Sequence, residues 1–201
     1  MRMLLLLTAV AVFNVAFADN HLTWKLNSAA SQLSFDSSKN TTIQETHRFR
    51  QLTGGVKQSG DIVVQVDLMS VDTRIPIRDQ RMREILFKMA PSAQVFTTVD
   101  MALVTAMATG QKLTLELSGR LSLNGKMSSL PLSVELQRLS DQSLQVSTGG
   151  SLDVAEYGYL PGIEALRQIA GLKTISTRVP YQLKLLFDKT EPSARRARTS
   201  T

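Results

Sequence analysis

The 201-residue sequence contains no cysteine and only two histidines. The absence of cysteine excludes disulfide bonds, thiolate metal sites, a cysteine nucleophile and an acylated lipoprotein cysteine. Because no disulfide can staple the chain, packing alone has to stabilise the fold. The histidines, His21 and His47, have no carboxylates around them at a metal-ligand spacing. The sequence therefore predicts no metal and no other cofactor.

Motifs for common catalytic chemistries are also lacking. The sequence has no G-x-S-x-G nucleophile elbow and no dinucleotide-binding fingerprint. Residues 119–126 depart from a phosphate-binding loop in their glycine spacing, and Met127 stands where that loop requires serine or threonine. The carboxylates are scattered rather than paired for glycosidase chemistry. These absences predict a protein that is not an enzyme.

Long apolar runs are absent except at the N-terminus. There, Arg2 precedes the short apolar run 3–13, and Ala16-Phe17-Ala18 forms a small-x-small cleavage site. Asn14 ends a run that is shorter than the roughly 20 apolar residues of a membrane-spanning helix. We expect a signal peptide cleaved after Ala18, a secreted periplasmic protein, and no transmembrane span in the mature chain.

Aromatic residues make up only 5% of the sequence, although the net charge is +6. Part of that charge lies in residues 189–201, where Arg195, Arg196 and Arg198 predict a disordered basic tail. For an exported protein with few aromatics, nucleic acid is not an expected partner. The predicted organisation is a signal peptide over 1–18, one domain over 19–188 and the tail.

Alternation of apolar and polar residues dominates the rest of the chain and predicts strands with one buried face. The clearest runs cover residues 62–68, 113–123, 130–136 and 179–187, and shorter ones cover 22–26, 33–36, 49–52, 95–103 and 144–146. Asn124-Gly125 separates two such runs and predicts a tight hairpin. Further turns are predicted at Gly54-Gly55, Ser59-Gly60, Thr109-Gly110 and Gly149-Gly150.

Two segments have helical rather than alternating spacing. Residues 76–89 form an amphipathic pattern that ends before Pro91, and residues 162–170 form a second one that ends at Gly171. The sequence thus predicts an all-β domain of roughly eight to ten strands with one or two short helical insertions, either a closed antiparallel barrel or a sandwich. Closure is favoured because it leaves no apolar sheet edge unpaired.

Several spaced motifs resemble the YceI family. They are Leu68 to Thr73 (LMSVDT), Arg78-Asp79, Met82-Arg83, Leu86-Phe87, residues 91–98 (PSAQVFTT) and residues 117–125 (LSGRLSLNG). The chain departs from the family pattern at 153–158, where only Tyr157-Gly158 is kept, and in the insertion 162–171. The resemblance implies an extended lipocalin-like antiparallel β-barrel whose long hydrophobic channel binds a polyisoprenoid or another lipid-like amphiphile, often in a homodimer.

Inward positions of the alternating strands, together with one phenylalanine of the first helical segment, are the candidates for the lining of that channel. The strand positions are Phe35, Phe49, Val64, Val66, Phe96, Leu115, Leu117, Val134 and Leu183, and the helical residue is Phe87. Three charged residues of the first helical segment, Arg78, Asp79 and Arg83, are the candidates for polar groups at the channel mouth. His47 is expected to be a surface residue of a strand.

Three hypotheses for function stay open at this point. The first is a periplasmic carrier or sequestering protein for an isoprenoid or fatty amphiphile. The second is a ligand-free structural or stress-related interaction module with a filled core. The third is an enzyme on the barrel that uses Arg78, Asp79 and Arg83. Alternation does not distinguish a hollow barrel from a filled one, although a barrel of about eight strands is wide enough for one ligand.

Overall fold

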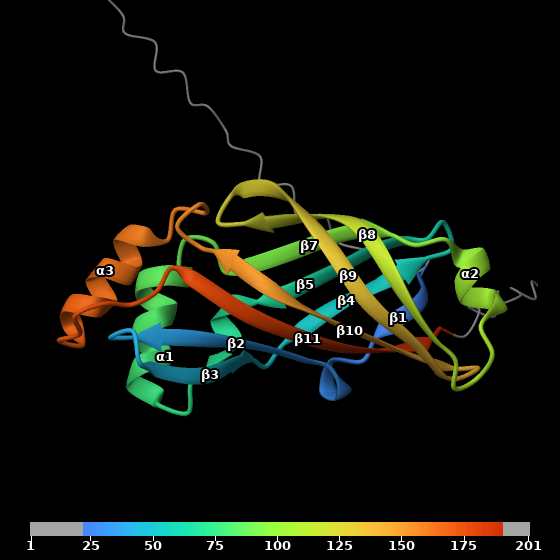
Figure 1. Ribbon diagram of the computed structural model, residues 1–201, viewed down its shortest axis with the longest axis horizontal. Coiled ribbons are helices and arrows are strands. Elements are labelled where there is room, and N and C mark those ends of the chain that lie inside the picture. The colour runs from blue at the N-terminus through green and yellow to red at the C-terminus, as the bar shows by residue number, and fades with distance from the viewer. Residues whose placement is uncertain (1–21, 191–201) are drawn as a thin grey trace, which may run out of the picture.

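The computed structural model describes residues 22–190 and shows one antiparallel β-barrel (Figure 1). Eight strands close it in the order β1-β4-β5-β7-β8-β9-β10-β11, with β11 pairing back onto β1. Three further strands, β2, β3 and β6, continue the sheet beyond β11. The predicted lipocalin-like all-β barrel is confirmed.

The elements have the following bounds. The strands are β1 (Leu22–Leu26), β2 (Gln32–Lys39), β3 (Ile43–Phe49), β4 (Leu52–Lys57), β5 (Asp61–Asp67), β6 (Val71–Asp72), β7 (Ser92–Thr98), β8 (Lys112–Leu123), β9 (Lys126–Ser140), β10 (Ser143–Asp153) and β11 (Arg178–Lys189). The helices are η2 (Ser28–Ala30), η3 (Leu68–Ser70), α1 (Pro76–Met82) with its π-helical continuation η4 (Arg83–Phe87), α2 (Met101–Ala106) and α3 (Leu160–Ile169).

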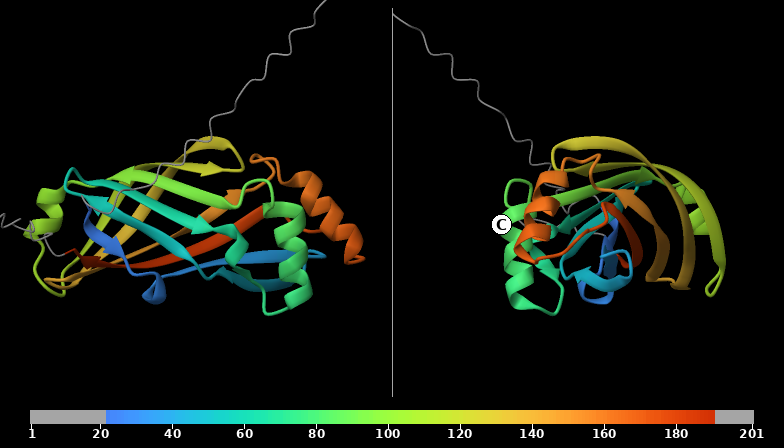
Figure 2. Two further views of the ribbon diagram at one scale, coloured as in Figure 1. Left: turned by 180° about the vertical axis from the view of Figure 1, so that it is seen from behind. Right: turned by 60° about the vertical axis from the view of Figure 1, so that its left-hand side comes forward.

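Long strand β11 changes partner along its length, which elongates the barrel. Its C-terminal part pairs with β1, where Leu26 faces Phe187, and its middle pairs with β2, where Phe35 faces Tyr181. The short helix η2 separates β1 from β2, and the Asn27 side chain caps it by accepting from the Ala30 amide at 3.1 Å. Helices α1 and α3 lie together beyond β2 and β3, whereas α2 lies at the opposite end (Figures 1 and 2). The two ends of the barrel therefore differ, because α1 and α3 lie at one and α2 lies at the other.

The Asn124-Gly125 hairpin forms as predicted. Both residues have positive φ, 50° and 74°, as a two-residue turn of this hand requires. The Asn124 side-chain amide also donates to the Tyr157 carbonyl at 2.8 Å. This hydrogen bond joins the β8–β9 turn to the segment that leads into α3.

Two predicted turns are wrong, because Gly54-Gly55 lies within β4 and Gly149-Gly150 lies within β10. Gly54 has φ of 151°, and a Cβ there would lie 2.2 Å from the Val63 carbonyl oxygen. A Cβ at Gly55 would lie 2.6 Å from the Trp24 carbonyl oxygen. These glycines allow neighbouring strands to approach closely rather than reversing the chain.

The strand predicted over 95–103 is also wrong beyond Thr98. Asp100 caps helix α2 by accepting from the Ala102 amide at 2.8 Å, and Val104 and Met107 are buried against the end of the barrel. The helix predicted over 76–89 appears as α1 and η4, and the one over 162–170 appears as α3.

Some sequence predictions concern residues outside the described range. The signal peptide over 1–18, its cleavage after Ala18, the position of His21 and nearly all of the basic tail lie outside residues 22–190. Within that range, no helix is long and apolar enough to cross a membrane.

A candidate ligand channel inside the barrel

Two adjoining cavities run through the interior of the barrel. The larger has a volume of about 330 Å³ and is bounded by α1, η4 and α3, and the smaller, of about 110 Å³, is bounded by α2. We name them the outer chamber and the inner chamber. Five residues line both chambers: Val64, Val95, Leu130, Tyr181 and Leu183. The chambers therefore adjoin at these residues, and we refer to the two together as the channel.

A row of aromatic rings forms one wall of the outer chamber. Phe35 stacks on Phe49 with ring centroids 5.0 Å apart, and Phe49 meets Phe87 edge-on at 5.9 Å. Phe87 in turn meets Tyr159 edge-on at 6.1 Å. The row links strands β2 and β3 to η4 and to the residue before α3. Such offset and edge-on contacts add to the stabilisation from apolar burial and fix the ring positions.

The inner chamber is lined almost entirely by aliphatic side chains. On the β8–β9 pair, Leu115 is opposite Val134 and Leu117 is opposite Leu132, so these side chains share the inward face. Trp24, the only tryptophan of the chain, also lines this chamber. A single tryptophan at this position makes its fluorescence a local probe of the inner chamber.

The structure brings most of the predicted channel residues together. Those in the outer chamber are Phe35, Phe49, Val64, Val66, Phe87 and Leu183, and those in the inner chamber are Val64, Leu115, Leu117, Val134 and Leu183. Phe96 lines neither chamber and is corrected to the outer face of β7, because its neighbours Val95 and Thr97 both line the channel. A shift of one residue along a strand inverts the face of a side chain.

Sequence reasoning missed several lining residues. Leu130, Val95 and Tyr181 lie within the predicted alternating runs, so the alternation contained the signal for them. Helix α3 contributes Ile163 and Leu166, and the residue that caps its C-terminus, Ala170, lies on the same apolar face of the insertion 162–171. This insertion therefore forms part of the chamber wall.

The outer chamber has one polar end. Its polar lining residues are Asp36, Ser37, Lys39, His47, Arg78, Arg81 and Ser176. They come from β2, β3, α1 and the segment before β11. Ser176 lies beside β2, because its backbone amide donates a hydrogen bond to the Ser38 carbonyl. We name this group the polar pole.

Of the three charged residues predicted at the mouth, only Arg78 belongs to the polar pole. Its guanidinium donates to Glu45 at 2.7 Å and to the Thr73 carbonyl at 2.9 Å. Arg81, rather than Arg83, is the second arginine of the lining, because residues three apart share a helix face whereas residues five apart do not.

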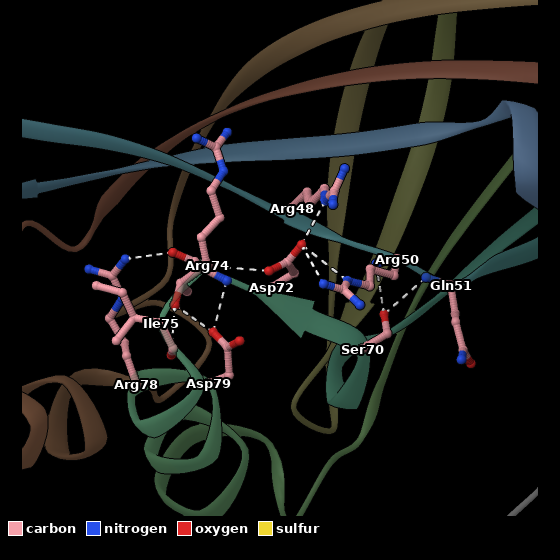
Figure 3. Close-up of polar contacts among 10 residues, drawn as sticks. Arg48, Arg50, Gln51, Ser70, Asp72, Arg74, Ile75, Arg78 and Asp79 are labelled. Carbon is pink, nitrogen blue, oxygen red and sulfur yellow. Dashed lines mark hydrogen bonds and ion pairs between the residues drawn. The ribbon is translucent and has the colours of Figure 1, made fainter.

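Asp79 lies outside the lining and has a structural role. Its carboxylate is buried and accepts hydrogen bonds from the Thr73 amide at 2.8 Å and the Thr73 hydroxyl at 2.5 Å (Figure 3). Both bonds tie the first turn of α1 to the chain before Pro76, which begins the helix. Asp79 thereby fixes the position from which Arg78 reaches the chamber.

A second buried carboxylate, Asp72, anchors β6 to β3 beside the same helix. It accepts from Arg48 at 2.8 Å, from Arg50 at 3.0 Å and from the Arg74 amide at 3.0 Å (Figure 3). Hydrogen bonds from Arg48 and the Arg74 backbone, followed by that from Arg50, lower the Asp72 pKa to about 2. Arg74 adopts a φ of 63°, which turns the chain from β6 towards α1.

His47 is buried, and its prediction as a surface residue is wrong. Its side chain lines the outer chamber, its Nε2 lies 2.9 Å from the Ser37 hydroxyl, and its Nδ1 has no partner among the described residues. Burial, and then the charge of Arg78, lowers the His47 pKa to about 4, against an opposing effect of Glu45. The imidazole is therefore neutral at neutral pH.

Stability should fall with acidification because of His47. The unfolded chain binds a proton at the ordinary histidine pKa near 6.5, whereas the folded protein resists protonation until about pH 4. The free energy of unfolding should therefore be highest above pH 6.5 and should fall by about 3 kcal/mol as the pH falls towards 4. Urea unfolding at pH 7 and pH 4.5 measures it, and His47→Gln should flatten the curve in this window. An equally steep loss in His47→Gln would contradict the assignment.

The channel defines the class of the protein. A closed antiparallel barrel with an apolar interior and a single polar end is the architecture of ligand-binding barrels of the lipocalin type. Among residues 22–190, no group of three or more histidine, aspartate or glutamate side chains could hold a metal ion. A model of the YceI-like domain matches residues 24–187, and the chain belongs to this family.

Solved structures of the same fold include a polyisoprenoid-binding domain from Saccharophagus degradans implicated in plant cell wall breakdown. It is 37% identical, with a TM-score of 0.82 over 84% of this chain and 99% of that one. BcnA from Burkholderia cenocepacia is 14% identical (TM-score 0.59; 80% and 98% covered), and the YCEI protein of Campylobacter jejuni is 12% identical (TM-score 0.53; 72% and 85% covered). The last two show similarity of fold alone. A comparison with the curated proteins finds no match.

Proposed function

We propose that this protein binds a long-chain amphiphile, such as a polyisoprenoid or a fatty-acid derivative, within the barrel channel. The observation that carries the proposal is the pair of apolar chambers that adjoin at Val64, Val95, Leu130, Tyr181 and Leu183. The polyisoprenoid-binding domain at 37% identity supports this ligand class. Binding without catalysis fits a channel whose charged groups lie at one end only.

The binding free energy of such a ligand would come from its tail. Each methylene that leaves water for an apolar site contributes about 0.8 kcal/mol. The inner chamber and most of the outer one offer aliphatic and aromatic contacts, so a tail that reaches both chambers gains from its full length. Selectivity then depends on channel length and on the polar pole.

We further propose that the protein works in the periplasm as a carrier. The N-terminal pattern of Arg2, the apolar run 3–13 and Ala16-Phe17-Ala18 supports export. A closed channel shields an apolar tail from water during its passage through an aqueous compartment. A protein exported in this way would meet its ligand outside the cytoplasm.

Native mass spectrometry of the mature protein, purified from the periplasm of its host and followed by organic extraction, tests the proposal. We expect a stoichiometric apolar molecule bound to the barrel. The same spectra give the start of the mature chain, expected at Asp19, and show whether the protein is a homodimer. A mass without ligand that stays unchanged after incubation with isoprenoids and fatty acids would favour a ligand-free interaction module instead.

A further inference from the structure

Several hydrogen-bond donors of the polar pole have no acceptor among the surrounding residues that the structure describes. We propose that it binds an anionic oxygen head group, a phosphate, pyrophosphate or carboxylate, at the end of the bound tail. This inference rests on the proposed function, since it assigns the head group of the same ligand. The groups that would bind the head group are the three cations of the chamber lining, Lys39, Arg78 and Arg81, together with His47.

The cations of the polar pole retain unused donors. Lys39 and Arg78 both bind one carboxylate, Glu45, which lies between them. The Arg78 Nε is buried without a partner, although the terminal nitrogens are bound. Arg81 lines the chamber and makes no hydrogen bond or ion pair with any residue in the described range. Donors on β2 and α1 therefore remain available to a ligand.

The acceptors nearby are already engaged. Glu45 accepts from two cations, and Asp36, the one carboxylate of the lining, accepts from the Thr46 hydroxyl at 2.7 Å. Asp79 is held by Thr73 outside the lining. A head group made of acceptor oxygens would meet donors without competing for them, and hydrogen bonds to charged groups are roughly twice as strong as neutral ones.

His47 adds a donor that a neutral imidazole can supply. If the Ser37 hydroxyl donates to Nε2, the ring proton lies on Nδ1, the atom that has no partner. The groups whose charge acts on this ring are Arg78, Glu45, Lys39 and Asp79. An added anion would favour the protonated ring, so head-group binding should raise the pKa of His47.

The head group and tail would then occupy opposite ends of one channel. The polar pole lies beside α1 and α3, and the inner chamber with Trp24 lies towards α2. An amphiphile with its head at Lys39 and Arg81 would direct its tail past the aromatic row to the junction of the chambers. Trp24 fluorescence would report the tail, and the His47 ring would report the head.

Matched ligands that share a tail test the inference. Titrations of the wild-type protein with geranylgeraniol and geranylgeranyl phosphate, and with a fatty alcohol and the fatty acid of equal length, are followed by Trp24 fluorescence. We expect each anion to bind about tenfold tighter than its alcohol, the effect of one charged hydrogen bond. Preference for the phosphate alone would assign the site to phosphorylated prenyl lipids, and preference for the fatty acid alone would assign it to carboxylates.

Variants identify the residues responsible. The double variant Lys39→Gln/Arg81→Gln should lose most of the preference for the phosphate over the alcohol, whereas Arg83→Gln, on the same helical segment but outside the lining, should keep the wild-type ratio. A ratio that survives in the double variant would overturn the assignment. Equal binding of alcohol and phosphate by the wild-type protein would overturn the inference while leaving the proposed function intact.

A measurement on the wild-type protein keeps the test independent of whether the binding-site variants fold. We expect the phosphate, but not the alcohol, to raise the apparent pKa of His47 followed by NMR of the ring nitrogens, with His47→Gln used for assignment. Unchanged His47 signals in the presence of bound phosphate would contradict the inference. If neither ligand changes Trp24 fluorescence or the native mass, both the inference and the proposed function fall.

Discussion

Val95→Phe is expected to exclude ligand from the inner chamber while leaving the barrel folded. Val95 lies at the junction, where it lines both chambers together with Val64 and Leu130. The larger ring would fill the passage between the chambers. In a packed core such overpacking costs about 1–3 kcal/mol, but here the ring enters open volume, so we expect a stability change within about 1 kcal/mol.

Loss of the inner chamber removes the contacts of the distal part of the tail. If about four methylenes lose their burial, the cost is about 3 kcal/mol, or roughly a hundredfold in affinity. A ligand short enough to fit the outer chamber should bind as before. Titrations with isoprenoids of increasing length, followed by Trp24 fluorescence and native mass spectrometry, measure this difference.

Thr98→Phe is the matched control for Val95→Phe. Thr98 lies on the same strand β7 with an exposed side chain on the other face, so the same bulky ring is added away from the channel. We expect the control to bind long and short ligands like the wild-type protein. Equal affinities of Val95→Phe and Thr98→Phe for the longest ligand would show that a tail does not pass the junction.

The barrel could be predicted from the sequence because alternation and burial have the same cause. Every second residue of β8 and β9 faces the interior, so Leu115, Leu117 and Val134 could be assigned before the structure was known. Phe96 could not, because the short run around it gives two registers that differ by one residue. The aromatic ring suggested the interior, but the pairing of β7 with β5 places Val95, not Phe96, inside.

Whether the barrel is hollow could not be predicted from the alternation. A filled and a hollow interior require the same apolar inward positions, and the difference lies in how far apart the strands hold them. Here the additional strands β2, β3 and β6 and helices α1 and α3 extend one end of the barrel around the larger chamber. These pairings join segments distant in sequence, such as β2 with β11.

The polar end of the channel was predicted only in part for a related reason. Local spacing indicates a charged helix, and of its residues predicted at the channel mouth the structure places Arg78 in the chamber lining. The neighbours of Arg78 on β2 and β3 come from residues more than thirty positions earlier in the chain. Burial alternates along β3, with Gln44, Thr46 and Arg48 exposed. His47 has no sequence signal for burial because the polar residues Glu45 and His47 interrupt the apolar residues of the opposite face. Tertiary pairing alone places His47 against Phe35 and Arg78.

Asp72→Asn is expected to destabilise the end of the barrel that holds the polar pole. The buried Asp72 carboxylate accepts from Arg48, Arg50 and the Arg74 amide, and hydrogen bonds to a charged group contribute about 1.5–3 kcal/mol. Because the two arginine side chains are 53% and 63% exposed, solvent screens their charge, and we expect a loss near the lower bound, about 2 kcal/mol, at pH 7. Urea unfolding measures it, with Asp61→Asn at the exposed first residue of β5 as the control.

The pH dependence of the free energy of unfolding distinguishes the contribution of Asp72 from that of His47. The pKa of Asp72 is lowered from 3.8 to about 2, so its contribution is present above about pH 4 and is lost as the pH falls towards 2. The deficit of Asp72→Asn relative to the wild-type protein should therefore stay constant from pH 7 to pH 4 and shrink below it, whereas the His47 effect lies between pH 6.5 and 4. A stability deficit that instead shrinks above pH 5 would assign the loss to another group.

Asp72 also sets the path of the chain from β6 into α1. The preference for anionic head groups requires Arg78 and Arg81 of α1 to lie at the chamber, so we expect Asp72→Asn to reduce this preference.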